Sequence, residues 1–289
     1  MRRLSNLIAA RFVGNVFVAN AFVANAFIAG MCIAAVLVAA GAARAEPGSV
    51  WIDDLTWPEI RDAIAAGKRT AIVYTGSSEQ NGPHMVIGKH NFIAHALAQR
   101  IAEELGDALV YPTLPYAVAG NAIARTGHMR FPGTVTLPPE VFYGVVRGVA
   151  QSALTAGFKV VALMGEHGGG QEELALAAKE LDAQARPDGA RVLFIGDLYA
   201  KSRLQMRDIL AKRGLPSDED HAGIPDTSSL LYLQTQGQWV RPDKIELADA
   251  KTGVQGHPQF ATAELGKVYL DLKVDLAVKQ IRSLLASSK

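Results

Sequence analysis

The chain has 289 residues, of which 49% are hydrophobic and 20% are charged, which is the balance of an ordinary globular protein. Residues 1–45 carry four arginines and no acid, so the net charge of +1 becomes +1 minus 4, or −3, for residues 46–289. A slightly acidic chain has no electrostatic footprint for nucleic acid, which excludes that class of partner. Cys32 is the only cysteine, so residues 46–289 contain neither a disulfide framework nor a thiol nucleophile.

The first 45 residues predict a secretory signal peptide. Three arginines form a basic start, a run rich in Ala, Val, Phe and Ile follows, and residues 43–45 (ARA) match a small-x-small cleavage site. A quasi-repeat in residues 17–30 (FVANAFVANAFIAG) lengthens the apolar run, so an uncleaved inner-membrane anchor is the competing interpretation. We expect cleavage without a lipid anchor, no membrane attachment afterwards, and a periplasmic or secreted mature domain of residues 46–289.

Apolar and helical segments alternate from residue 57 to residue 195. Four short apolar runs predict buried strands at Thr70–Tyr74, Ala108–Tyr111, Lys159–Met164 and Arg191–Ile195. The periodic segments between and after them predict helices at Trp57–Ala66, Asn91–Leu105, Pro139–Ala156, Gln171–Ala185 and Tyr199–Arg213, with a terminal helix ending near Leu285. This alternation predicts one α/β domain, a three-layer α/β/α sandwich with a mainly parallel central sheet.

Three polar clusters follow or flank the apolar strands. They are Thr75–Asn91 (TGSSEQNGPHMVIGKHN), His167 with its glycines, and Asp218–Asp226 (DEDHAGIPD). In a parallel sheet the first two loops leave the same edge, where α/β proteins place their ligands. Glu79, His90, His167 and one acid of the third cluster could then converge. Imidazoles with carboxylates are a ligand set for Zn²⁺ or a similar divalent ion.

Each cluster also has a competing interpretation. The first could be a solvated loop in which Gly and Pro merely turn the chain. His167 alone could be a buried histidine with satisfied hydrogen bonds. Gly168–Gly170 could cradle a phosphate, although GEHGGGQ is neither a P-loop nor GxGxxG. A Ser–His–Asp hydrolase would use Ser77 or Ser78, but GSSEQ lacks the G-x-S-x-G elbow.

Taken together, these segments resemble the creatininase family of metal-dependent amidohydrolases. Four motifs match in one order: GSSEQNGPHMVIGKHN resembles GxxEQHGPHLPxGTD, GHMRFPGTVTL resembles HxxFPGTxxL, MGEHGGGQ resembles NGHGGN, and HAGIPDTSSLLYL resembles HAGxxETSxxL. Gly253–Gly266 resembles the family's C-terminal GxxGxPxxAxxxxG segment. The resemblance covers residues 70–266. It implies a single α/β/α domain, a homo-oligomer, and a metal centre that hydrolyses C–N bonds of amides and cyclic amides.

The resemblance implies a ligand set with replacements. Glu79 and His167 match family positions, whereas His90 stands for the Asp of GTD, Asp226 for the Glu of ETS, and Asn81 for the His of EQHG. A neutral imidazole offers one lone pair and cannot bridge two ions as a carboxylate can. We therefore predict one divalent ion per subunit, zinc before manganese or iron, held by Glu79, His90, His167 and Asp226.

These inferences predict an exported amidohydrolase that cleaves a small amide or cyclic amide with metal-activated water. A proton donor for the leaving nitrogen is needed, and the candidates are Glu166, His128 and Glu172. The expected substrate pocket contains Asn81, His84, Gly168, Gly169 and His221. Creatinine is not the expected substrate, because the metal and pocket residues differ. The competing hypothesis is a catalytically inactive periplasmic small-molecule-binding protein on the same scaffold.

Overall fold

The computed structural model describes residues 48–218 and 220–287. The predicted signal peptide and its alternative as a membrane anchor lie outside these residues. Within the described part of the chain, none of the helices combines the length and the apolar character that crossing a bilayer would need.

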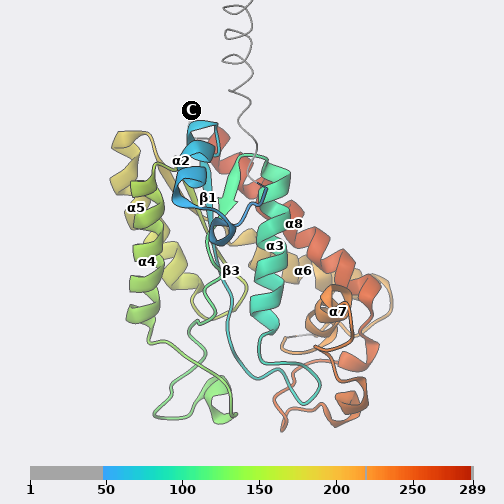
Figure 1. Cartoon of the computed structure of the whole chain (residues 1–289). Helices are drawn as coiled ribbons and strands as arrows, with labels where there is room; N and C mark the ends of the chain where they lie inside the picture. Colours follow the sequence, from blue (N-terminus) through green and yellow to red (C-terminus); the bar gives the residue numbers. More distant parts are fainter. Residues whose placement is uncertain (1–47, 219, 288–289) are drawn as a thin grey trace, which may run out of the picture. The chain divides into compact units, whose positions relative to one another are not determined.

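The centre of the domain is a four-stranded sheet in which every pair of neighbouring strands is parallel. The strand order is β2-β1-β3-β4 (Figure 1). The strands are β1 (Thr70–Thr75), β2 (Ala108–Val110), β3 (Val160–Gly165) and β4 (Arg191–Phe194). All six residues of β1 and of β3 are buried, as in the continuous apolar runs that identified them.

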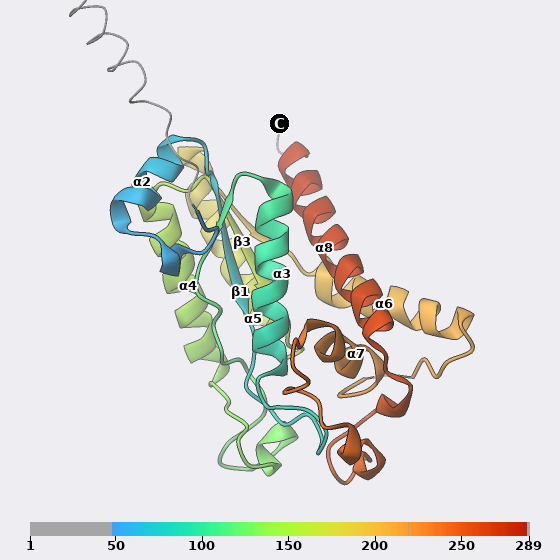
Figure 2. The same ribbon diagram turned by 45° about the vertical axis from the view of Figure 1, so that its right-hand side comes forward.

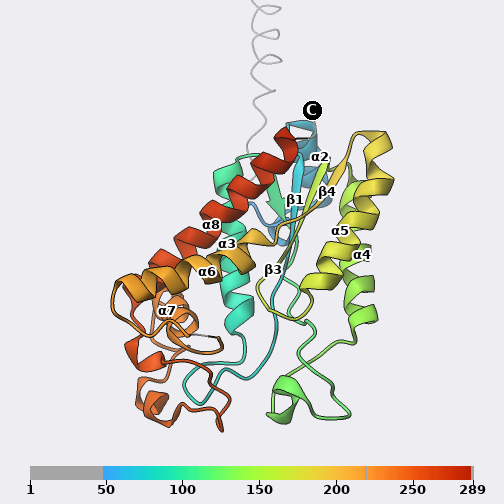
Figure 3. The same cartoon turned by 180° about the vertical axis from the view of Figure 1, so that it is seen from behind.

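Helices cover both faces of the sheet. The helices are α2 (Trp57–Ala65), α3 (Lys89–Leu105), α4 (Pro139–Ala156), α5 (Gln171–Ala185), α6 (Asp197–Lys212), α7 (Ile224–Leu233) and α8 (Ala263–Ala286). In Figures 1 and 3, α4 and α5 lie on one side of the sheet, and α3, α6 and α8 lie on the other. Figure 2 shows α3 and α8 running beside each other over the sheet. The predicted three-layer sandwich is confirmed.

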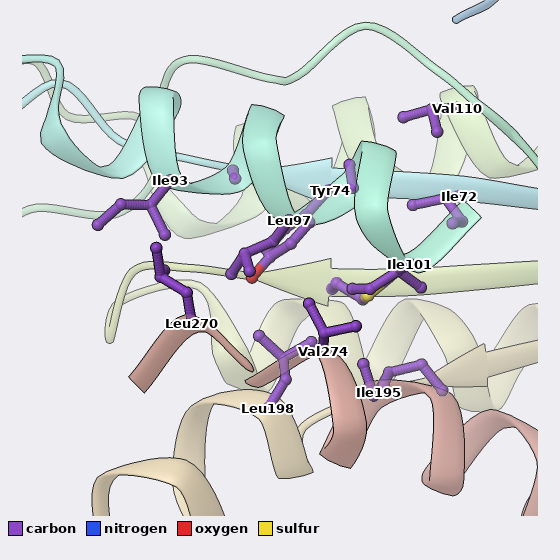
Figure 4. Close-up of a cluster of buried hydrophobic side chains, with 14 of the residues drawn as sticks. Ile72, Tyr74, Ile93, Leu97, Ile101, Val110, Ile195, Leu198, Leu270 and Val274 are labelled. Atoms are coloured by element: carbon purple, nitrogen blue, oxygen red, sulfur yellow. The ribbon is translucent and has the colours of Figure 1, made fainter. Parts of the chain in front are cut away.

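Alternate residues of each strand pack against opposite layers, because successive side chains of a strand point to opposite faces. Ile72 and Tyr74 of β1 belong to the cluster formed with α3 and α8. Ala71 and Val73 belong to the cluster formed with α4 and α5. Figure 4 shows the first cluster, in which the strand residues meet Ile93, Leu97, Ile101, Leu198, Leu270 and Val274.

Two helices that hold polar residues of the site differ from the prediction: α3 begins two residues earlier, and α7 was not predicted as a helix. α3 begins at Lys89 rather than Asn91, because the Gly88 carbonyl accepts hydrogen bonds from the Asn91 and Phe92 amides and closes the first turn. α7 begins at Ile224, so Asp226 lies in its first turn. Lys89, His90 and Asp226 are therefore held by helical backbone rather than by loops.

The register of the sheet brings two polar loops together. Thr75, the last residue of β1, is paired with Gly165, the last residue of β3. The loop that carries Glu79 and the loop that carries His167 therefore leave the same edge of the sheet, at the carboxyl ends of adjacent strands. This is where doubly wound α/β proteins bind ligands.

Candidate metal centre

The centre of this edge is the carboxylate of Glu79, which is completely buried. His90 Nε2 lies 2.7 Å from one carboxylate oxygen and His167 Nε2 lies 2.7 Å from the other. Burial alone would raise the pKa of the Glu79 carboxyl, but attraction to His90 and the hydrogen bonds from both rings outweigh it and hold the pKa well below its usual range. Glu79 is therefore a buried, ionised carboxylate.

Two further imidazoles complete a ring around this carboxylate. His128 Nε2 lies 3.4 Å from Glu79 Oε2, and His221 Nδ1 lies 3.7 Å from Oε1. Ligand atoms of Glu79, His128 and His167 all lie within 4.8 Å of one another. The rings of His128 and His221 are 4.4 Å apart between centroids. One carboxylate and four imidazoles thus converge from segments far apart in the sequence.

Three of these histidines, His90, His128 and His221, are neutral at physiological pH. Burial lowers the pKa of His90 to about 3 and that of His221 to about 4, and it also lowers the pKa of His128. A neutral imidazole has a free ring lone pair, and this is the form that coordinates a metal. A buried carboxylate with an imidazole at each oxygen fits Zn²⁺, Mn²⁺ or Fe²⁺. The residues present therefore fit a divalent ion.

Gln80 determines which ring nitrogens carry protons. Its amide orientation is fixed, because Oε1 accepts the Gly82 amide at 2.9 Å and Nε2 donates to the Gly253 carbonyl at 2.9 Å. The Gln80 main-chain carbonyl can only accept, so His221 Nε2, 2.9 Å away, carries a proton. The second Gln80 amide hydrogen then goes to His128 Nδ1 at 2.9 Å. His128 consequently presents an Nε2–H to the centre, whereas His221 presents the Nδ1 lone pair.

A buried ion pair lies beside the carboxylate–histidine cluster. Lys89 Nζ donates to Asp226 Oδ2 at 2.6 Å, and the lysine side chain is fully buried. The same Asp226 oxygen accepts the Ala222 amide at 2.8 Å. Burial would raise the pKa of Asp226, but the Lys89 ammonium outweighs it and holds the pKa far below its usual range. The predicted ligand Asp226 is therefore paired with Lys89, and it is not in the group formed by Glu79, His128 and His167.

The cluster opens into a cavity of about 340 Å³. Glu79 and the four histidines form one part of its wall, and the main chain of Gly168 and Gly169 forms another. The remaining wall carries Tyr199, Tyr269, Arg203 and Lys273. A volume of this size holds a small organic molecule rather than a folded partner.

The comparisons with known proteins agree with this geometry. The family model described as creatininase, creatinine amidohydrolase, matches residues 53–281. The chain belongs to the creatininase family. Creatinine amidohydrolase of Pseudomonas putida is 28% identical over 203 residues, which cover 69% of this chain and 75% of that protein. The mycofactocin precursor peptide peptidase of Mycolicibacterium smegmatis is 29% identical over 204 residues, with 68% and 72% covered.

Solved structures of creatininase share the fold. A creatininase mutant described as Zn-Zn type matches with a TM-score of 0.66 and 25% identity, covering 81% of this chain and 98% of that one. A structure described as Creatininase Mn matches with a TM-score of 0.66 and 24% identity, covering 81% and 98%. The resemblance predicted from the five motifs is confirmed.

The candidate proton donors lie in three different environments. His128 faces the centre from η2 (Gly127–Arg130). The Glu166 carboxylate accepts hydrogen bonds from Tyr74 Oη at 2.6 Å and from Lys273 Nζ, so both of its oxygens are engaged. Glu172 is exposed in the first turn of α5 and does not line the cavity. Of the three, only His128 directs a proton at the Glu79 cluster.

The five residues predicted for the pocket also separate into two groups. Gly168, Gly169 and His221 line the cavity. Asn81 is buried behind it and donates to the main-chain carbonyls of Glu79 and Val86 at 2.9 and 3.1 Å, which shapes the loop. His84 is also buried behind it, and its Nε2 lies 3.0 Å from Thr227 Oγ1.

Among the residues of the cavity wall that sequence reasoning missed are Lys89, Tyr199, Arg203 and Lys273. Tyr199 and Arg203 stack on each other from α6, with the guanidinium carbon 5.4 Å from the ring centroid. Lys89 could have been predicted as a site residue from the sequence, because it directly precedes the predicted ligand His90 inside a polar motif. The other three lie on helices whose helical pattern does not distinguish them from surface residues.

Gly169 is required where the second loop meets the chain near residue 118. A Cβ atom at Gly169 would lie 1.8 Å from the Val118 carbonyl oxygen. We expect Gly169→Ala to lower the free energy of unfolding by about 1–3 kcal/mol, because main chain must move to relieve the clash. Gly144→Ala is the control: a Cβ there meets nothing within 4 Å, and alanine favours the α4 helix by up to about 1 kcal/mol. Equal stabilities of the two variants in urea unfolding would contradict this.

His84 should make the fold sensitive to acid. Burial lowers its pKa from 6.5 to about 4, so the unfolded chain takes up this proton at a higher pH than the folded chain does. Above pH 6.5 the titration of His84 does not change the free energy of unfolding. As the pH falls from 6.5 toward 4, it lowers the free energy of unfolding by up to roughly 1.4 kcal/mol per pH unit. His84→Gln should flatten this slope in urea unfolding, whereas His257→Gln, at a side chain 38% exposed, should leave it unchanged. Parallel pH profiles for wild type and His84→Gln would refute the assignment.

Proposed function

We propose that the protein is an exported metal-dependent hydrolase that cleaves a C–N bond in a small amide or cyclic amide. The observation that carries the proposal is the buried, ionised Glu79 with an imidazole at each carboxylate oxygen, facing a cavity of about 340 Å³. Membership of the creatininase family supports hydrolysis as the reaction class. The fold alone would not support hydrolysis, because proteins with unrelated functions share folds.

Glu79, His90 and His167 would hold the ion. When bound, a divalent ion polarises an amide carbonyl and lowers the pKa of water. The other roles fall to residues of the chain. The His221 Nδ1 lone pair can accept a proton from water, and the His128 Nε2–H can donate a proton to the leaving nitrogen. Gln80 preserves both protonation states, because its side-chain amide donates to His128 Nδ1 and its main-chain carbonyl accepts from His221 Nε2.

The choice of substrate rests on size. A cavity of about 340 Å³ is at the small end of ligand pockets, which favours a compact amide or lactam over a long peptide. The two kinds of relative suggest two candidate substrate classes, since one relative is named a creatinine amidohydrolase and the other a peptide peptidase. A peptide bond near a chain end is therefore the second candidate.

A substrate panel tests the proposal. The purified protein, loaded with Zn²⁺ or Mn²⁺, would be incubated with linear amides, lactams, cyclic ureides and short peptides, and amine release would be followed by mass spectrometry. We expect hydrolysis of a small amide or cyclic amide that a chelator abolishes and added metal restores. Metal-replete protein that binds panel members without cleaving any would support the inactive binding protein instead. Cleavage of peptides alone would favour the second candidate.

The N-terminal segment carries the export proposal. We expect expression of the full chain in a Gram-negative host to yield periplasmic protein whose N-terminal sequence begins at Glu46, after residues 43–45. Fractionation followed by N-terminal sequencing measures both properties. A full-length product that remains in the membrane fraction would contradict cleavage and support the anchor.

A further inference from the structure

Lys89 has an unusual position for a lysine. It is the first residue of α3, and its side chain is completely buried. The N-terminus of a helix carries a partial positive charge, so an ammonium there is electrostatically disfavoured. A buried charge also loses its hydration. A lysine in this position needs a compensating anion, and Asp226 supplies it at 2.6 Å.

The position of Asp226 also suits the binding of a cation. It lies in the first turn of α7, with its side chain 24% exposed, and its Oδ2 is shared between the Lys89 ammonium and the Ala222 amide. A carboxylate that lines the same cavity as Glu79 is a potential metal ligand. Here an amino group of the chain already neutralises it.

The ammonium also lies close to the histidines of the centre. Lys89 directly precedes His90, whose Nε2 contacts Glu79, and both residues line the cavity together with His128 and His221. A positive charge in this cavity disfavours an additional metal cation among these imidazoles.

We propose that the Lys89 ammonium takes the place of a second metal ion, so that the centre holds one divalent ion beside a permanent positive charge. A creatininase mutant of the Zn-Zn type shows that a two-metal centre occurs on this fold. In this chain Glu79 and Asp226, which both line the cavity, have separate partners, imidazoles for Glu79 and an ammonium for Asp226. This inference rests on the proposed metal-dependent function.

The test is the number of Zn²⁺ ions bound per chain, measured by equilibrium dialysis and elemental analysis. Wild type should saturate at one ion. Lys89→Gln, which keeps an amide donor for Asp226 but removes the charge, should bind a second ion, and Lys89→Met should do the same. Lys89→Gln combined with Asp226→Asn should return to one. Lys279→Met, which removes an exposed lysine paired with Asp275, should stay at one.

The outcomes separate the two proposals. Wild type that binds two ions overturns the role of Lys89 whatever the variants do. Wild type and folded Lys89→Gln that both bind one ion also overturn it, while the proposed function stands. Wild type that binds none overturns the proposed metal-dependent function, and the Lys89 proposal with it. Circular dichroism of each variant shows that the comparison is between folded proteins. If both lysine variants unfold, the number of Zn²⁺ ions bound by wild type decides the outcome.

Discussion

Replacing Glu79 by glutamine is expected to remove metal binding and hydrolysis together. The substitution keeps the size of the side chain but replaces one charged oxygen with an amide NH₂, which then faces a histidine that also has a proton to donate. Loss of a partner that only orients a ligand already costs about 10–100-fold in metal affinity, so loss of the central carboxylate should exceed about 100-fold. Isothermal titration with Zn²⁺ measures the affinity.

Glu172→Gln is the matched control for this variant. Both residues are glutamates that follow parallel strands, but Glu172 is exposed and outside the cavity. We expect wild-type zinc affinity and wild-type hydrolysis for Glu172→Gln. A folded Glu79→Gln protein that retains both properties would contradict the account of the centre.

Replacing Lys273 by methionine should lower the free energy of unfolding by about 3–5 kcal/mol, the usual cost of removing one member of a buried ion pair. The side chains of Lys273 and Glu166 are 3% and 4% exposed and contact each other beneath the cavity. Burial would lower the pKa of the Lys273 ammonium, but attraction to Glu166 outweighs it and raises the pKa. Without Lys273, Glu166 would keep only Tyr74 as a partner.

A double variant separates the lost pair from lost packing. Lys273→Met with Glu166→Gln removes both charges, so it should be more stable than Lys273→Met alone, as is found when buried pairs are replaced together. Urea unfolding of wild type, the single variant and the double variant gives the comparison. A double variant that is less stable than the single variant would show that packing, not charge, governs this contact.

The architecture was largely predictable because each strand is an apolar run buried on both faces. β1, β3 and β4 were predicted to within one residue at each end. The motif glycine Gly169 stands where the main chain approaches Val118 too closely for a Cβ atom. Local composition was sufficient to locate these strands, since the apolar run of a parallel strand between two helical layers has few alternative structures.

The candidate site was predictable for residues on the loops that follow adjacent strands. It was less predictable for pairs of residues that join distant segments of the chain. Glu79, His90 and His167 were predicted together from strand topology, and the structure places them together. Asp226 was assigned to the metal from sequence, but its contact with Lys89 spans 137 positions along the chain, and no spacing rule links the two residues.

Glu166 illustrates how strand geometry decides a side chain's role. It extends the pairing of β3, since its amide donates to the Thr75 carbonyl at 2.9 Å. Its side chain therefore follows the alternation of Met164 and points toward the layer of α8, where Lys273 and Tyr74 engage it. Adjacency to His167 in sequence suggested a proton donor, but the Glu166 carboxylate is turned toward Tyr74 and Lys273, which engage both of its oxygens.

Anomalous diffraction from crystals grown with Zn²⁺, recorded at the zinc edge, tests the central claim most directly. The account predicts one strong peak per chain, about 2.0–2.2 Å from a carboxylate oxygen of Glu79 and from ring nitrogens of His90 and His167. It predicts no peak between Lys89 and Asp226. Zinc-replete crystals without a peak beside Glu79 would contradict the account.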